Sequence, residues 1–274
     1  MARFCDQALI LRRFRFGETS LVVQVLTRAN GRVHLLAKGA YRPTSRYYAA
    51  LDLFDTLELE WLSSPGRELC TLQLASIAER RHRLAQDLEC YGAGLTMLEL
   101  ADLGSQDGPL NQELYSLTRA GLDRLLQPGS TQRALVEFEL AFLHNLGLAP
   151  ALVECATCGG AAPATGNKAA RRAAFSAQSG GRLCSSCSRE ARASGRRVGT
   201  LPESVLLHAA RLATGVQPVL QTQPTVMTAS EAKEDARALL LVRDVVARFL
   251  EHQIQGRPKS YRTFLAGPQR NLAQ

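Results

Sequence analysis

Short runs of alternating hydrophobic and polar residues occupy the first 80 residues of the chain. Alternation places hydrophobic side chains on one face of a strand, and turn-forming residues separate the runs. The pattern is most regular where Leu57, Leu59 and Trp61 alternate with polar residues. We therefore predict strands at residues 7–13, 20–27, 32–39, 51–62 and 68–77. Five short strands are typical of a small barrel such as an OB-fold, although an SH3-like barrel would give a similar pattern.

The strongest turn signal is the pair Asn30-Gly31, which lies between the second and third predicted strands. Both residue types tolerate a positive φ. The pair therefore predicts a hairpin with a two-residue type I′ turn.

From about residue 82 the hydrophobic residues recur at the spacing of a helix, as in Leu84, Leu88, Tyr91, Leu95 and Leu98. Helices are expected at residues 82–104, 109–127, 131–147, 203–213 and 231–254. Residues 161–174 are rich in Ala and Arg without periodicity, so they are expected to form a mobile insert. The predicted fold class is α+β, with a five-stranded OB-fold barrel in residues 1–80 and an α-helical domain in residues 81–274.

The composition is that of a globular protein of 274 residues, with 46% hydrophobic and 21% charged residues. No hydrophobic run approaches the ~20 residues of a membrane-spanning helix. The N-terminal residues do not resemble a secretory signal, because arginines lie close on both sides of the apolar stretch. We therefore expect a cytoplasmic protein without membrane contact.

Positive charge is concentrated in three segments of this chain, whose formal net charge is +8. Residues 3–46 carry nine cations and two acids, and residues 155–200 carry eight cations and one acid. Residues 256–274 carry four cations and no acid, so the remainder of the chain is acidic. Segregated basic surfaces predict a polyanionic partner such as nucleic acid.

Four of the seven cysteines form two CxxC pairs, Cys155 with Cys158 and Cys184 with Cys187. Each pair can place two sulfurs on one tight turn, and two such turns complete the tetrahedral S₄ set of a structural zinc site. An odd cysteine count in a chain of this length argues against a disulfide scaffold. We therefore predict a structural Zn²⁺ in a region that spans residues 153–200. Cys5, Cys70 and Cys90 lie in apolar runs and are expected to be ordinary buried cysteines.

Cations alternate with tyrosines in residues 38–48, the predicted loop after the third strand. Lysine and arginine neutralise phosphates, and exposed tyrosine rings can stack on unpaired bases. We predict a surface for single-stranded nucleic acid there, with Tyr41 or Tyr47 as the base-stacking residue. The residues predicted to bind the nucleic acid are Arg12, Arg13, Arg32, Lys38, Tyr41, Arg42 and Arg46. Because alternation places Arg12 and Arg13 on opposite faces, only one of them is expected to point at the nucleic acid.

Nucleotide-binding, metalloprotease and serine-hydrolase motifs are absent from the sequence, and its five histidines are scattered. No catalytic residue is therefore predicted, and the protein is not expected to be an enzyme. Two alternatives remain open on the zinc and charge signals. One is a zinc-containing RNA-modifying enzyme, and the other is a zinc-ribbon factor associated with the ribosome or RNA polymerase.

Four segments of the chain, in the same order, resemble signatures of the RecO family of DNA repair proteins. The first resembles the family's first strand and turn, and the second its next hairpin and basic loop. The third resembles its helix-to-zinc junction, and the fourth its C-terminal signature. These segments are residues 8–13 with 17–20, residues 26–28 with 31–32 and 36–40, residues 138–140 with 146–159, and residues 258–265.

This resemblance implies an N-terminal OB-fold, a helical domain with embedded zinc, and a role in RecF-pathway recombinational repair. It implies binding to single- and double-stranded DNA and annealing of complementary strands. It also implies joint action with RecR in loading the recombinase onto DNA coated by single-stranded-DNA-binding protein. A nucleoid-associated location in the cytoplasm would follow.

Overall fold

The computed structural model describes residues 1–45, 47, 50–66, 68–105, 112–129, 131–166, 171–214 and 229–263, without the side chains of residues 229–235. The chain divides into two compact units. Unit 1 comprises Met1–Thr131 and Pro258–Gly267, and unit 2 comprises Gln132–Arg257 and Pro268–Gln274. The domain boundary predicted near residue 80 lies within unit 1 and stays a prediction.

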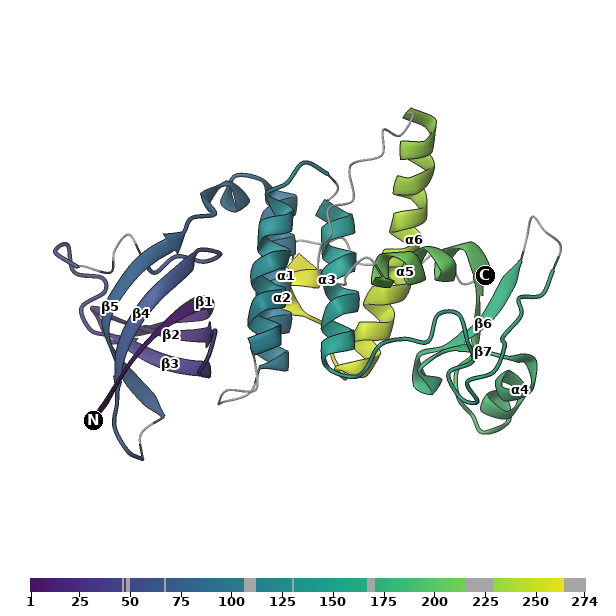
Figure 1. Cartoon of the computed structure of the whole chain (residues 1–274), viewed down its shortest axis with the longest axis horizontal. Coiled ribbons are helices and arrows are strands. Elements are labelled where there is room, and N and C mark those ends of the chain that lie inside the picture. Colours follow the sequence, from purple (N-terminus) through teal and green to yellow (C-terminus); the bar gives the residue numbers. More distant parts are fainter. Residues whose placement is uncertain are drawn as a thin grey trace. The chain divides into compact units, whose positions relative to one another are not determined.

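The described residues of unit 1 include five strands that close into a barrel in the order β1-β2-β3-β5-β4 (Figure 1). The strands are β1 (Ala2–Phe16), β2 (Ser20–Thr27), β3 (Gly31–Ala37), β4 (Thr56–Ser63) and β5 (Leu69–Glu79). β3 and β5 pair in parallel, and the other neighbours are antiparallel. The predicted OB-fold, and with it the α+β fold class, is confirmed.

Alternation along the strands separates the barrel core from its outer face. Val23, Val25 and Leu35 are fully buried in the core, together with Leu57 and Leu59. Burial of one branched or aromatic side chain of this size contributes about 1.5–3 kcal/mol, so these residues account for much of the barrel's stability. Trp61, which alternates with Leu57 and Leu59 along β4, is only 2% exposed.

The structure corrects the predicted start of the fourth strand. β4 begins at Thr56, because the chain bends at Phe54, which has a positive φ of 74°. The Phe54 ring lies edge-on to Tyr91, and a Cβ atom added to Gly94 would lie 2.8 Å from it. The absence of a side chain at Gly94 therefore lets Phe54 reach helix α1 (Leu88–Gly104).

The predicted two-residue turn at Asn30-Gly31 is also wrong in detail. Thr27 pairs with Gly31, so the loop has three residues, and Gly31 alone of the predicted pair has a positive φ, 69°. Oδ2 of Asp6 accepts hydrogen bonds from the backbone N–H groups of Ala29 and Asn30. A carboxylate on β1 thus holds a longer turn that local sequence did not indicate.

Helices of unit 1 follow the barrel. They are η1 (His82–Ala85), α1 (Leu88–Gly104), α2 (Gln112–Leu125) and α7 (Lys259–Thr263), and α1 and α2 lie side by side (Figure 1). Asp87 caps α1 by accepting a hydrogen bond from the backbone N–H of Cys90 over 2.7 Å. Glu99 of α1 accepts hydrogen bonds from the backbone N–H groups of Lys259 and Ser260, which holds α7 on α1.

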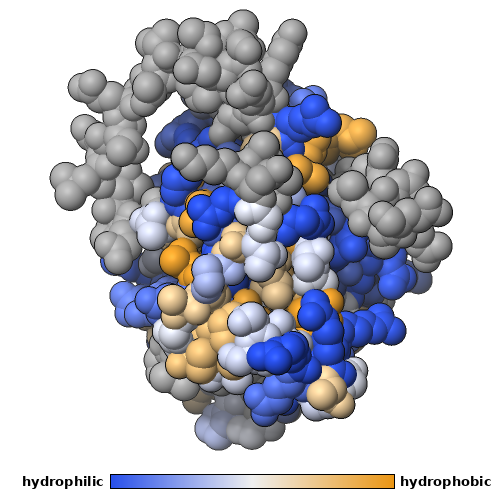
Figure 2. Space-filling view, turned by 90° about the vertical axis from the view of Figure 1, so that its right-hand side faces the viewer, coloured by the Kyte–Doolittle hydropathy of each residue, from blue (hydrophilic) through white to orange (hydrophobic). Residues whose placement is uncertain are grey.

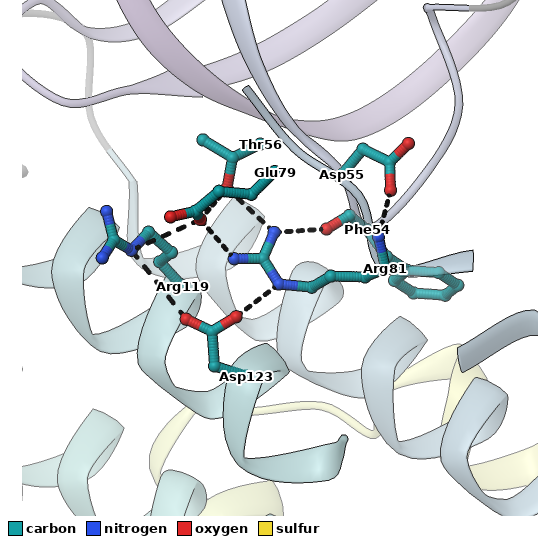
Figure 3. A network of polar contacts seen from close by, with 7 residues as sticks. All are labelled: Phe54, Asp55, Thr56, Glu79, Arg81, Arg119 and Asp123. Carbon is teal, nitrogen blue, oxygen red and sulfur yellow. Dashed lines mark hydrogen bonds and ion pairs between the residues drawn. The ribbon is translucent and has the colours of Figure 1, made fainter. Parts of the chain in front are cut away.

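A buried arginine joins the barrel to α2 (Figure 3). The Arg81 guanidinium donates hydrogen bonds to the Phe54 carbonyl over 2.9 Å, the Thr56 hydroxyl over 2.8 Å and the Glu79 carboxylate over 2.8 Å. It also donates to Asp123 of α2 over 2.6 Å. Arg81 therefore fixes the end of the barrel against the helix with charge-assisted hydrogen bonds.

Unit 2 contains most of α3 (Thr131–Asn145), helices α5 (Glu203–Thr214) and α6 (Ala229–Gln253), and a small region around the cysteines (Figure 1). That region contains β6 (Arg172–Ser176), η3 (Ala177–Ser179), β7 (Gly181–Leu183), α4 (Ser185–Ala193) and β8 (Gly199–Pro202). Sequence patterns did not predict these short elements. In the described part of the insert, Thr165 bridges Arg172 and residues 172–174 belong to β6, so the expectation of a mobile segment is wrong there.

Candidate nucleic-acid interface and metal centre

The loop after β3 forms a shallow basic hollow at one end of the barrel. Arg42 N–H donates to the Gly39 carbonyl over 3.0 Å, and Tyr41 N–H donates to the Thr19 carbonyl over 2.9 Å, which ties the loop to the β1–β2 hairpin. The hollow has a volume of about 270 Å³ and is lined by Lys38, Gly39, Arg42, Thr44, Ser45 and Tyr47. Among the described residues, no carboxylate pairs with Lys38 or Arg42, so both exposed cations can meet phosphates.

The two tyrosines of this loop have different environments. Tyr41 is 52% exposed, and the Arg15 guanidinium lies 5.7 Å from the centre of its ring. Tyr47 is 4% exposed, and its hydroxyl donates to the Leu72 carbonyl over 3.0 Å. Tyr47 is thus a core residue and cannot stack on a base, which corrects that expectation. The ring of Tyr41 is accessible for stacking.

Arg12 and Arg13 lie on opposite faces of β1, and each contacts a carboxylate. Arg12 pairs with buried Asp102 of α1. Nη1 of Arg13 donates to the Leu51 carbonyl over 2.9 Å and lies 3.1 Å from a carboxylate oxygen of Asp52. The two side chains remain 43% and 40% exposed, so each can still reach a phosphate, but part of each charge is already neutralised.

Arg32 and Arg46 were also predicted to bind the nucleic acid. Arg32 is half-buried on the outer face of β3, in register with Leu26. Arg46 lies outside the described residues. The DNA-binding assignments of all seven residues stay predictions.

The outer face of the barrel carries an exposed apolar row that sequence reasoning missed. Phe14 pairs with Val22, and Val22 pairs with Leu36. Directly paired residues project to the same face, and the flanking residues of β2 fill the core, so this row faces outward. Phe14 is 47% exposed, and Phe16, two residues further along the same face, is 54% exposed.

Phe14 and Phe16 lie in the last part of β1, beyond residue 13, where the predicted strand ended. Beyond Leu9, β1 has no strand partner on its second edge among the described residues, yet it continues to Phe16 alongside β2. Lys38 follows β3 at the rim of the row, two residues beyond Leu36. Continuing the alternation of basic and aromatic residues past Arg13 would have revealed the two phenylalanines.

The structure brings all four predicted cysteines together in a candidate metal centre. The Sγ atoms of Cys155, Cys158, Cys184 and Cys187 lie within 4.8 Å of one another, and all four residues are free thiols. Sulfurs around a tetrahedral Zn²⁺ lie roughly 3.8 Å apart, from Zn–S bonds of about 2.3 Å. The cluster can therefore close around a metal ion with small side-chain shifts.

Local backbone structure places these sulfurs. Gly159, with a φ of 69°, donates its N–H to the Cys155 carbonyl over 2.8 Å and closes the first turn. Cys184 lies at the N-cap position of α4, so Cys187 falls in the first turn of that helix. The two CxxC pairs thus come from a loop and from a helix start.

Hydrogen bonds in the cluster favour the thiolates of Cys184 and Cys155 and oppose that of Cys187. The Ser186 hydroxyl, 3.1 Å from the sulfur, and then the Cys187 backbone N–H lower the pKa of Cys184 to about 6. Its hydrogen bond with Cys184 raises the pKa of Cys187 to about 12. Burial opposes ionisation of Cys155, but backbone N–H groups, first that of Cys184, outweigh it and lower its pKa. Since metals bind thiolates, this donor set fits a thiophilic ion such as Zn²⁺.

Two family models match this chain. The model of the Recombination protein O N terminal matches residues 1–81, and that of the Recombination protein O C terminal matches residues 85–262. The chain belongs to the RecO family.

Relatives named DNA repair protein RecO come from diverse bacteria. The Rhodopirellula baltica relative is 32% identical over 180 residues, which cover 66% of this chain and 65% of that relative. The Nocardioides relative is 33% identical over 76% of this chain and 82% of its own length. The Myxococcus xanthus relative is 29% identical over 95% of this chain and 96% of its own length. Within the described residues, no helix combines the length and apolar content of a membrane crossing.

Proposed function

We propose that this RecO-family protein acts in recombinational DNA repair by binding single- and double-stranded DNA and annealing complementary strands, without bond chemistry of its own. Membership of the family supports the repair role. The observation that carries the DNA-binding proposal is the exposed row of Phe14 and Phe16 beside Lys38 and Arg42, two exposed cations with no carboxylate partner in the part of the chain that the structure describes. Cations and accessible aromatic faces together are what a single strand requires.

The proposed mechanism is electrostatic. Lys38 and Arg42 neutralise phosphates, which reduces the repulsion between strands, while Phe14, Phe16 and Tyr41 hold unpaired bases. Base pairing supplies the free energy of annealing. The protein lowers the barrier by bringing strands together in a conformation with exposed bases.

Strand binding and annealing by the purified protein at two salt concentrations, about 50 and 200 mM, test the proposal. Replacing Lys38 and Arg42 by Ala should lower the single-strand salt slope by roughly 1.4, since each lost phosphate contact contributes about 0.7. Replacing Phe14 and Phe16 by Leu should weaken single-strand binding by about 1–3 kcal/mol per stacked base and leave the slope unchanged.

Phe4→Leu is the matched control, because Phe4 is an exposed aromatic residue of β1 that stacks on Trp61 outside the row. It should leave DNA binding unchanged. If the cation variant and the aromatic variant both fold and still bind and anneal DNA as well as the wild-type protein, the barrel is not the DNA surface.

The metal is proposed to be one structural Zn²⁺ held by Cys155, Cys158, Cys184 and Cys187. Metal analysis should give about one zinc per chain, and its removal should lower the thermal stability of unit 2. Cys155→Ser should lose the metal, whereas Cys5→Ser, which is outside the cluster, should retain it. Cys5 is exposed, so the expectation that it is a buried cysteine is wrong, whereas Cys70 is buried as expected. A metal-free protein of unchanged stability would contradict the structural role.

RecR and single-stranded-DNA-binding protein are the proposed partners in recombinase loading, in the cytoplasm at the nucleoid. Docking is assigned to the helical region, where Leu207 of α5 and Leu240 of α6 are 42% and 59% exposed. Pull-downs with each partner should weaken when both leucines are replaced by Asp in the full-length chain. Unchanged recovery of both partners would remove these leucines from the proposed docking surface.

A further inference from the structure

Some arginines of the cysteine region contact the fold, and others, called here the external set, are exposed without a carboxylate partner among the described residues. Arg182 is buried; it donates to the Ala162 carbonyl over 2.7 Å and shares Glu203 with Arg171. Arg171 and Arg172 are exposed but are held on the fold, Arg171 by Glu203 and Arg172 by the Thr200 carbonyl. The remaining arginines of the region are exposed, and among the described residues no carboxylate pairs with them: Arg189, Arg192, Arg196 and Arg197.

Helix α4 and the turn after it fix the backbone of the external set. α4 buries Ser188 and Ala191, while Arg189 and Arg192, three residues apart, are neighbours on its exposed side. Gly195, with a φ of 79°, ends the helix, and the Arg196 N–H donates back to the Ala191 carbonyl over 2.9 Å.

The backbone of the next residue, Arg197, is also held in place by a hydrogen bond. The backbone N–H of Arg197 donates to the Gln178 side chain over 2.7 Å. The external arginines therefore form a surface whose backbone is ordered without any ligand, which lowers the entropy cost of binding one.

This surface keeps a positive charge even beside the metal centre. In residues 154–203, the described residues carry seven arginines and three glutamates. Zn²⁺ with four thiolates would add a charge of −2, and the region would still be positive. The side of the molecule seen in Figure 2, on the right in Figure 1, shows hydrophilic residues in separate patches among paler and hydrophobic ones. Excess cations on an ordered surface fit a chain of phosphates.

The side chains of this surface limit the kind of ligand that it can bind. Among the described residues of the cysteine region, no large aromatic side chain is exposed, in contrast to Phe14, Phe16 and Tyr41 on the barrel. A nucleic acid bound here would be held by its backbone, with its bases left free to pair.

We propose that Arg189, Arg192, Arg196 and Arg197 form a second DNA surface, which holds the phosphate backbone of one strand while the barrel holds the other. This inference rests on the proposed annealing function. It also gives the metal a role in DNA binding, because Cys184 and Cys187 hold the start of the helix that carries the arginines. Loss of zinc should therefore weaken this second surface.

A bridging assay tests the proposal. The full-length zinc-loaded protein is bound to an immobilised oligonucleotide, and capture of a second, labelled, non-complementary strand is measured. Replacing the four arginines by Ala should weaken capture of the second strand at least about tenfold and lower its salt slope by up to about 2.8, at roughly 0.7 per contact. Annealing should slow in parallel, while binding of the first strand should change less than about twofold.

Two further variants make the result specific. Replacing the same four arginines by Lys should restore most of the bridging, because phosphate neutralisation needs charge rather than a fork geometry. Replacing Arg83, Arg124, Arg211 and Arg237 by Ala, an equal charge change at exposed positions elsewhere, should leave bridging unchanged.

The outcomes separate this inference from the function on which it rests. If the four-Ala variant keeps its zinc and still bridges and anneals strands as well as the wild-type protein, the second DNA surface is overturned. The proposal for the barrel would still stand. Equal loss of bridging in the equal-charge control would also overturn it, since net charge alone would explain the effect. Failure of the wild-type protein to bind any single strand would instead overturn the proposed function.

Discussion

Nε of Arg81 donates a hydrogen bond to Oδ1 of Asp123 over 2.6 Å, although the two residues are separated by 42 positions in the chain. The Arg81 side chain is only 1% exposed, and its other nitrogens contact the Phe54 carbonyl, Thr56 and Glu79. Such a buried guanidinium is stable only while these acceptors surround it. It makes the OB-fold barrel and α2 parts of one unit.

Replacing Arg81 by Ala should therefore lower the free energy of unfolding by about 2–4 kcal/mol, because buried acceptors lose their donors. The neighbouring Arg80 is the matched control, since its side chain is 54% exposed and lies 3.8 Å from Asp55. Arg80→Ala should cost less than about 1 kcal/mol. Urea unfolding of both variants measures the difference, and equal effects would contradict the role given to Arg81.

Glu79 should make the stability of unit 1 depend on pH. Burial opposes its ionisation, but hydrogen bonds from Thr56 and the charges of Arg119 and Arg81 outweigh burial and lower its pKa. A carboxyl with a lowered pKa stabilises the fold above its unfolded pKa of about 4.3, and this contribution is lost as the pH falls through the folded value. Glu79→Gln should thus flatten the loss of stability below about pH 5. Urea titrations from neutral to acidic pH check this, and identical pH profiles would contradict it.

Gly181 should be indispensable to the metal centre. Its φ is 143°, and an added Cβ would lie 2.3 Å from the Ala151 carbonyl oxygen. Gly181→Ala should break the hydrogen bond from Arg182 N–H to that carbonyl, which is 2.8 Å long, and cost at least about 2 kcal/mol.

Gly199→Ala is the control, because the nearest atom to its added Cβ lies 3.9 Å away. The rate of zinc release to a chelator should rise for Gly181→Ala and stay near the wild-type rate for Gly199→Ala. Equal release rates would show that the close approach at Gly181 does not hold the centre together.

Tyr41 and Tyr47 should respond in opposite ways to substitution. Tyr41→Ala should weaken single-strand binding by about 1–3 kcal/mol with little change in stability, because its ring is exposed. Tyr47→Phe should leave DNA binding intact and cost about 1 kcal/mol of stability, because the hydrogen bond to the Leu72 carbonyl is lost. Oligonucleotide titration and urea unfolding separate the two effects, and a DNA-binding defect in Tyr47→Phe would reverse this assignment.

The barrel and the cysteine cluster could be predicted from the sequence because both depend on regular spacing. Alternation at Leu57, Leu59 and Trp61 reports which face of a strand is buried, since the side-chain period of a strand is two. The spacing within Cys155–Cys158 and Cys184–Cys187 reports tight turns, and the structure brings all four sulfurs together.

Only the tertiary structure decided which cations and aromatic residues are accessible. Nothing near Arg182 in the sequence shows that it is buried against Glu203, 21 residues away. Nothing near Tyr47 shows that its hydroxyl reaches Leu72, 25 residues away. The local spacing of hydrophobic residues indicates whether a segment is a strand or a helix. Whether a given side chain stays exposed depends on which distant segments pack over it. The sequence alone therefore indicated the barrel, the long helices and the four clustered cysteines, whereas long-range packing determined which cations and aromatic residues stay exposed.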